Sequence, residues 1–203
     1  MGKLLVAVRS APATYSLFAA NFVVFLYELY LSGAPVVKPI AVLKLGLFNL
    51  CVTECHQYWR LVSAMFVHLG WIHFALNMFF LIYLGSQLEI LVGKLRFLTV
   101  YFLAGILGNV MSVVFFGPYS LSGGASGALF GVVGALIIID GVLKKNIQVA
   151  LANAFFLFLI NSWMPHVNFI AHLGGLIVGL LIGYPYAEYV KGRMMRMEYW
   201  EEV

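Results

Sequence analysis

Residues 121–131 read LSGGASGALFG, and this short stretch decides how the rest of the chain is interpreted. It opens as a glycine-rich, loop-like segment, carries one hydroxyl at Ser126, and continues into apolar sequence that extends to about residue 142. A run of that length and composition predicts a helix that crosses a membrane. Ser126 would then stand at the start of a membrane helix, where polar groups usually have a function.

The composition of the whole chain indicates an integral membrane protein. Of its 203 residues, 63% are hydrophobic and 10% are charged, whereas soluble domains have about 25% charged residues. The length suits one domain, so residues 1–203 are expected to form a single unit. The predicted fold class is all-α, a polytopic six-helix bundle with spans near residues 13–31, 70–90, 96–116, 125–142, 147–163 and 168–187.

Basic residues predict the orientation of this bundle, because Lys and Arg concentrate in loops that stay on the cytoplasmic side. Nine of the 12 basic residues fall on one side of a six-span arrangement, and only Lys38, Lys44 and Arg60 fall on the other. Both termini are therefore expected in the cytoplasm, and the pI of about 9.1 needs no nucleic-acid partner to explain it. The outer segment 32–69 is apolar but broken by prolines and glycine, which predicts short helices in the interface.

Three polar side chains are predicted to lie at one depth, near the outer surface. At ~1.5 Å per helical residue, Ser126 stands roughly 27 Å above the inner marker Lys144. His172 stands about 28 Å above Lys191 by the same rise, and His73 reaches about 24 Å in the second span. Since the hydrocarbon core is about 30 Å thick, all three lie just inside the membrane.

Glycines on two of these helices predict that Ser126 and His172 meet. Small residues at a spacing of four let membrane helices approach closely. In the sixth span such residues share the helical face of His172, and in the fourth span they lie beside the face of Ser126. They are Gly175, Gly179 and Gly183 in the sixth span, and Gly127, Gly131 and Gly134 in the fourth.

A serine beside a histidine suggests nucleophilic catalysis, because a base must take the hydroxyl proton before the oxygen can attack. The reaction also needs donors for the developing oxyanion. His73 and Asn77, at i and i+4, present two side chains on one helical face, and main-chain N–H groups around Gly124 and Ser126 could add to them. The only aspartate, Asp140, lies about 21 Å from Ser126 along the helix, so the sequence permits a dyad but no triad.

The chain resembles the rhomboid intramembrane serine proteases over nearly its whole length. The resemblance rests on YWRLVSAMFVHLGWIHFALNMFF (58–80), GGASGALFG (123–131) and AHLGGLIVG (171–179). It implies an endopeptidase that cuts membrane proteins within or beside a transmembrane helix, in the lipid bilayer and without metal or cofactor. The positions that match the family's motifs are Trp59, Arg60, His68, His73, Asn77, Ser126, His172, Gly175 and Gly179. Phe130 departs from the pattern, since many relatives place there a tyrosine that packs on the catalytic histidine.

Other roles remain open for several of these residues. A serine at a helix start is often an N-cap, and His73 with Asn77 could join helices by hydrogen bonds. His68 is expected to structure its loop, and Trp59 with Arg60 to anchor the chain at the interface rather than to contact substrate.

The sequence disfavours three other functions: a zinc enzyme, a pseudoenzyme and a channel. A zinc enzyme would need the H-E-x-x-H pattern, which is absent here. A pseudoenzyme would typically lack the serine or the histidine. A channel would need polar residues distributed along a path through the membrane, whereas the polar residues of this site are confined to its outer third.

The remaining expectations concern the surroundings of the site. Cys51 and Cys55 face an oxidising side and either pair or stay free. Glu28, inside the first span, needs a protein or water partner that the sequence does not identify. The fifth span, with bulky Phe155 and Phe156, is the expected gate for substrate. The small six-span core suggests a prokaryotic plasma membrane.

Overall fold

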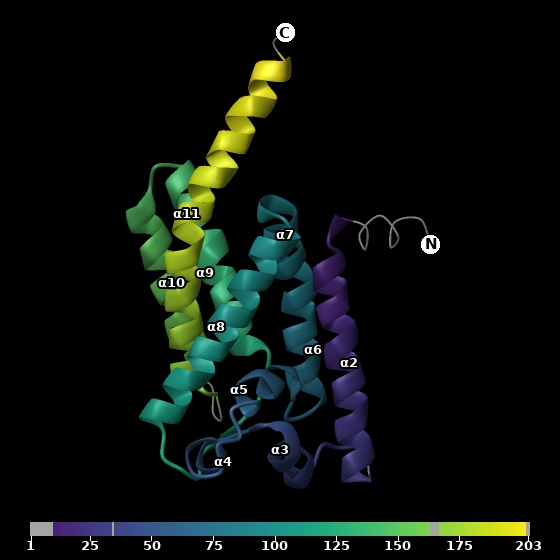
Figure 1. The fold of residues 1–203 in the computed structure, drawn as a ribbon. Coiled ribbons are helices and arrows are strands. Elements are labelled where there is room, and N and C mark those ends of the chain that lie inside the picture. The colour runs from purple at the N-terminus through teal and green to yellow at the C-terminus, as the bar shows by residue number, and fades with distance from the viewer. Residues whose placement is uncertain (1–9, 34, 163–166, 202–203) are drawn as a thin grey trace.

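The computed structural model describes residues 10–33, 35–162 and 167–201, and most of these residues are helical. The long helices stand side by side, and the short helices gather at one end of the bundle (Figure 1). The elements, in chain order, are α2 (Pro12–Ser32), α3 (Pro39–Leu45), β1 (Leu47–Phe48), α4 (Asn49–Thr53), α5 (Arg60–Ser63), the 3₁₀ turn η1 (Ala64–Phe66), α6 (Trp71–Phe80), the π-helical turn η2 (Leu81–Gly85), α7 (Ser86–Val92), α8 (Lys94–Phe115), β2 (Leu121–Ser122), α9 (Ser126–Leu143), α10 (Ile147–Ser162) and α11 (Phe169–Glu201).

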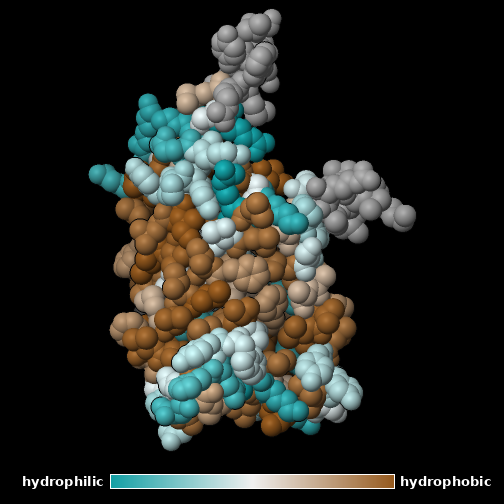
Figure 2. All heavy atoms as spheres, in the orientation of Figure 1, coloured by the Kyte–Doolittle hydropathy of each residue, from teal (hydrophilic) through white to brown (hydrophobic). Residues whose placement is uncertain are grey.

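The protein is an all-α polytopic membrane bundle. Five helical stretches are long and apolar enough to cross a bilayer: Pro12–Ser32, Trp71–Val92, Lys94–Phe115, Ser126–Leu143 and Phe169–Met195. The apolar part of α10, Ile147–Ile160, is shorter, so the described residues do not establish a count of six. Figure 2 shows apolar side chains over the middle of the bundle and polar side chains toward both ends, as a membrane belt requires.

Helix α11 is longer than the sequence predicted. The span was expected to end near residue 187, but the helix continues through Pro185 to Glu201. The residues after Tyr189 are mostly Lys, Arg, Met and Glu, which are good helix formers. The helix therefore extends away from the bundle, at the end where α2 begins (Figure 1).

The opposite end, here called the outer end, carries the segment between α2 and α6 (Figure 1). Its short helices α3, α4 and α5 agree with the expected interfacial helices. Strand β1 pairs antiparallel with β2, so that Leu47 faces Ser122 and Phe48 faces Leu121. This pairing fastens the first outer loop to the segment that leads into α9. Cys51 and Cys55 are both free thiols.

Close contact between α9 and α11 dominates the packing of the bundle. A Cβ added to Gly175 would overlap the carbonyl oxygen of Gly127, and a Cβ on Gly179 would overlap that of Gly131. A Cβ on Gly134 would lie 2.6 Å from the carbonyl oxygen of Leu176. The two backbones touch along these glycines, which is the packing that the glycine spacing predicted.

The first membrane helix is held at its inner end by a buried carboxylate. Glu89, in α7, accepts hydrogen bonds from the main-chain N–H of Ala13 (2.9 Å) and Thr14 (2.7 Å), and from the Thr14 hydroxyl (2.8 Å). These amides belong to the first turn of α2, where helical N–H groups lack partners and negative charge is favourable. Glu89 therefore caps α2 from a neighbouring helix.

Candidate active site

Ser126 and His172 meet at the outer end of the α9–α11 contact. Ser126 is the first residue of α9, and His172 lies in the first turn of α11. The Nε2 atom of His172 is 2.7 Å from the Oγ atom of Ser126, which is hydrogen-bonding distance. The ring of Phe130, one turn along α9, stacks on the imidazole with 4.3 Å between centroids and 22° between planes. Burial and stacking hold the imidazole in one orientation against the serine.

Asn168 caps the helix that carries His172, a role not predicted from the sequence. Its Oδ1 accepts the N–H of Ala171 (3.0 Å), so it caps the start of α11. Its Nδ2 donates to the hydroxyls of Ser112 (2.7 Å) and Ser122 (3.0 Å). One amide group thus links α8, the segment before Ser126 and the helix that carries His172. An asparagine just before a helix is a recognisable capping signal. The sequence does not show that its side chain also contacts the hydroxyls of Ser112 and Ser122.

His73 lies on the other side of the serine, next to Gly124. A Cβ placed on Gly124 would be 3.0 Å from His73 Nε2 and 3.4 Å from Ser126 Oγ, so both atoms border the same small space. Gly124 has φ 144°, a conformation that favours glycine, and the missing Cβ leaves room for the His73 ring.

The expected role of Gly124 as an oxyanion donor is wrong. Its N–H already donates to the carbonyl oxygen of Ala64, at 2.9 Å. The main-chain N–H of Ser126 is better placed for that task, because the first amides of a helix have no acceptor within the helix. Gly124 instead makes room for the imidazole of His73.

The hydrogen bonds of His73 define which ring nitrogen carries its proton. The N–H of Leu69 donates to Nδ1 at 3.3 Å, so Nδ1 acts as an acceptor. In a neutral imidazole the other nitrogen is then the donor. His73 therefore presents an Nε2–H group toward the space beside Ser126.

Asn77 lies one turn below His73 and is buried, with 5% of its surface exposed. Its Nδ2 donates to the carbonyl oxygen of His73 at 2.8 Å. Its Oδ1 has no partner among the residues that the structure describes. Since an amide nitrogen carries two hydrogens, one remains for a further acceptor.

His68 and Glu28 form a buried polar contact behind His73. The main-chain N–H of His68 lies 3.2 Å and 3.1 Å from the two carboxyl oxygens of Glu28. This is the partner that the sequence could not identify for Glu28. His68 Nδ1 contacts the carbonyl oxygen of Phe66 (3.1 Å), as a loop-structuring residue would. Burial, and then the nearby His73, lower the pKa of His68 to about 3, so its ring is uncharged at neutral pH.

Trp59 and Arg60 differ from each other in their surroundings. Trp59 is half exposed, whereas Arg60 is buried. Arg60 Nη1 donates to the carbonyl oxygens of Leu43 (2.9 Å) and Gly46 (2.6 Å). Unlike the expected interfacial anchor, Arg60 therefore holds the first outer loop together.

Other features of the chain lie apart from this site. Within residues 10–33, 35–162 and 167–201, no three His, Cys, Asp or Glu side chains form a group that could hold a metal ion. Asp140 pairs with Lys144 (2.8 Å) at the inner end of α9.

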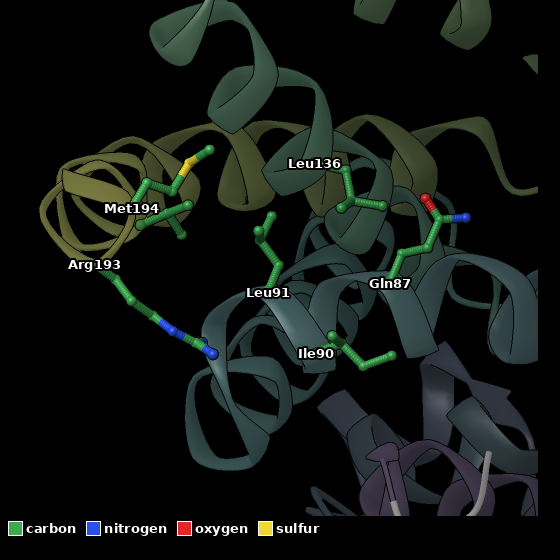
Figure 3. A pocket seen from close by; sticks show the side chains of 7 residues that line it. Gln87, Ile90, Leu91, Leu136, Arg193 and Met194 are labelled. Carbon is green, nitrogen blue, oxygen red and sulfur yellow. The ribbon is translucent and has the colours of Figure 1, made fainter. Parts of the chain in front are cut away.

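A hollow of about 510 Å³ also lies toward the inner end of α9, between α7, α9 and α11 (Figure 3). Its lining is Gln87, Ile90, Leu91, Leu136, Val190, Arg193 and Met194, none of them a site residue.

Helix α10 is attached to the bundle mainly by small side chains. Between residues 147 and 160, where burial is described, its buried residues are Ala150 and Ala154, and Ala150 packs against Gly141 of α9. Phe155 and Phe156 are exposed. They do not pack on neighbouring helices as the gate hypothesis assumed, so trimming them would not loosen the helix.

Comparisons with known proteins show what the chain is similar to. A family model described as "Rhomboid domain" matches residues 55–189. The chain is 36% identical over 139 residues to "RHOMBOID-like protein 6, mitochondrial" of Arabidopsis thaliana, covering 66% of this chain and 45% of the relative. It is 35% identical over 142 residues to "Inactive RHOMBOID-like protein 8" of the same plant (65% and 39%). It is 32% identical over 134 residues to "Rhomboid-like protease 3" of Toxoplasma gondii (62% and 51%).

Two consequences follow from these relatives. The chain spans about half of their length or less. They come from eukaryotes, so they do not support the expected prokaryotic membrane.

Proposed function

Because the chain belongs to the rhomboid family of intramembrane serine proteases, we propose that it cleaves peptide bonds of membrane proteins with Ser126 as nucleophile and His172 as general base. The observation that carries the proposal is the 2.7 Å contact between Ser126 Oγ and His172 Nε2. A name among the relatives includes the word "Inactive", and another includes "protease". This chain has both the serine and the histidine, in contact, which favours the active enzyme.

The reaction follows from the geometry. His172 Nε2 takes the hydroxyl proton as Ser126 Oγ attacks the carbonyl carbon of the substrate. The imidazolium then gives that proton to the leaving amine, and an acyl-enzyme ester remains on Ser126. A water molecule, deprotonated by the same imidazole, hydrolyses the ester and restores the serine. No acidic third residue is required, and none of the described acidic side chains is hydrogen-bonded to His172.

Charge that develops on the substrate oxygen needs donors in place beforehand. The Nε2–H of His73 and the N–H of Ser126 border the space beside Ser126 Oγ, and Asn77 keeps one amide hydrogen for the same purpose. Support for these roles comes from the tautomer that Leu69 imposes on His73 and from the small space beside Gly124.

The substrates that fit this site are transmembrane proteins. Ser126 lies near the outer end of a membrane helix, so water can reach it from that face, while a substrate helix must arrive from the lipid. Helix α10, whose described buried side chains include Ala150 and Ala154, is the proposed side of entry. Both termini are proposed to face the cytoplasm. The evidence for this gate is the weak attachment of α10. Phe155 and Phe156 are exposed and do not hold the helix in place.

The test uses purified protein with a labelled transmembrane substrate. Ser126→Ala and His172→Ala should each abolish cleavage without lowering the melting temperature, and the double variant should be no worse than either single, because the pair acts as one unit. A phosphonate probe should label wild-type Ser126 and not Ser126→Ala. Near-normal turnover by Ser126→Ala would refute the assignment. Activity lost to chelators and restored by zinc would reopen the metal alternative.

A further inference from the structure

A buried carboxyl group on the first membrane helix has no role in the reaction just described. Glu28 is 0% exposed. Burying a carboxyl group within a membrane protein is costly, so such a group usually has a function. Both of its oxygens face one main-chain N–H, that of His68. The two residues are 40 positions apart, so the contact joins α2 to the segment that precedes α6.

That segment lacks regular structure but must still be ordered. Residues 67–70 lie between η1 and α6, so their amides depend on partners outside a helix or strand. Two successive amides both find side chains: His68 donates to Glu28, and Leu69 donates to Nδ1 of His73. Because the two amides are adjacent in the chain, holding the first restricts the direction of the second.

The second amide has a chemical consequence. As long as the Leu69 N–H donates to Nδ1, the proton of His73 stays on Nε2, the nitrogen that borders Gly124 and Ser126. If that donor turns away, the proton can move to Nδ1, and Nε2 becomes an acceptor. An acceptor at that point would repel a developing oxyanion instead of stabilising it.

We propose that Glu28 is a positioning residue for catalysis: by holding the His68 amide, it keeps the Leu69 amide on His73 and so maintains the Nε2–H donor beside Ser126. The inference rests on the proposed function, in which His73 stabilises the oxyanion. It assigns a catalytic consequence to α2, a helix that contributes no residue to the Ser126–His172 pair.

The first test replaces Glu28 with methionine, which has similar length and no oxygen acceptor. We expect kcat to fall by about 10-fold or more, up to the 10²–10³-fold typical of losing one oxyanion donor, with KM little changed. The melting temperature should fall modestly, because the His68 amide loses its acceptor and a buried donor left without a partner is destabilising. Glu28→Gln keeps a carbonyl oxygen for the His68 amide and should restore most of kcat.

A double-mutant cycle shows whether Glu28 acts through His73. In the His73→Ala background, Glu28→Met should have no further effect on kcat, since the group that it positions is gone. The matched control is Glu89→Met. Glu89 is also buried, with 2% of its surface exposed, but it caps the inner end of α2, so the effects of its replacement should combine additively with those of His73→Ala. If Glu28→Met slows the His73→Ala enzyme by the same factor as the wild type, Glu28 is only structural and the proposal is overturned.

A spectroscopic measurement reads the tautomer directly. In ¹⁵N-histidine-labelled protein, with His73 assigned by its loss in His73→Ala, the nitrogen shifts should report Nε2–H in the wild type and a shift toward Nδ1–H in Glu28→Met. Leu69→Pro removes the N–H that donates to His73 Nδ1 and should give the same shift. It tests the role of this N–H if Glu28→Met does not fold. An unchanged tautomer in the folded variant would refute the inference. Full kcat in His73→Ala would refute the oxyanion assignment itself, whereas slow His73→Ala with normal Glu28→Met would refute only the positioning role.

Discussion

Adding one methyl group to Gly175 should strongly slow the proposed reaction by separating the helices that carry Ser126 and His172. A Cβ at this position would lie 2.9 Å from the carbonyl carbon of Gly127 and closer still to its oxygen. Ordinary contact for a Cβ begins at 3.4 Å, so the carbonyl carbon alone requires the backbones to move apart by 0.5 Å (3.4 minus 2.9), and the nearer oxygen requires more. Gly127 adjoins Ser126, and Gly175 lies one turn below His172, so the movement occurs at the depth of the reacting groups.

The same displacement would lengthen the contact between Ser126 Oγ and His172 Nε2 from 2.7 Å to about 3.2 Å or more. Misplacement of a catalytic group by about 1 Å can cost about 10²-fold in rate, so Gly175→Ala should lower kcat by roughly 10- to 100-fold. Overpacking should also destabilise the bundle by about 1–3 kcal/mol.

The assay compares kcat on a transmembrane substrate, the rate of phosphonate labelling of Ser126, and Tm in detergent. Gly192→Ala is the matched control, because it makes the same substitution in the same helix where no atom lies within 4 Å of the new Cβ. It should keep full activity and an equal or higher Tm, since alanine favours helix over glycine. If Gly175→Ala retains kcat and labelling within about twofold of the wild type, the contact of α9 with α11 does not set the geometry of the dyad.

Three further predictions concern single residues. Asn77→Ala should lower kcat by about 10²–10³-fold with smaller effects on KM and Tm; comparable damage to Tm and rate would indicate a structural role instead. His68, with its pKa near 3 in the folded protein and about 6.5 when unfolded, binds a proton more readily in the unfolded state. The contribution of His68 to the unfolding free energy should therefore be constant above pH 6.5 and fall by up to about 1.4 kcal/mol per pH unit below it. Denaturation series should show that contribution as the difference between the wild type and His68→Asn. Asn168→Ala should reduce kcat and slow phosphonate labelling, because the start of α11 loses its cap and both hydroxyl contacts; unchanged labelling would mean that other contacts hold His172.

The parts of the fold that follow from local pattern could be predicted from the sequence. Apolar runs of membrane-spanning length place the helices, because each run must satisfy its backbone within itself. Glycine spacing predicts which faces of α9 and α11 meet, because only small residues permit backbone contact. Depth along each helix then brings Ser126 and His172 to one level, which is the geometry seen.

What could not be predicted depends on contacts between distant segments. Glu28 meets the His68 amide, and Asn168 meets two serines, only because separate helices and loops converge. Gly124 looked like an oxyanion donor because it precedes a helix, but its N–H is taken by Ala64 from the first outer loop. Phe155 and Phe156 looked like gate residues because they are bulky, yet bulk does not reveal whether a side chain faces protein or lipid.

The distance along the chain between Ser126 and His172 has a consequence for biosynthesis. The two residues are 46 positions apart, and a ribosome adds about 5–20 residues per second. For roughly 2–9 s the proposed nucleophile exists without its proposed base, and Asn168, which caps the helix that carries His172, is also made late. A chain still being translated therefore carries the serine in an inert form among other newly inserted helices. Under the proposed function, cleavage of other membrane proteins can begin only when α11 has been synthesised and docked, so the order of translation delays it.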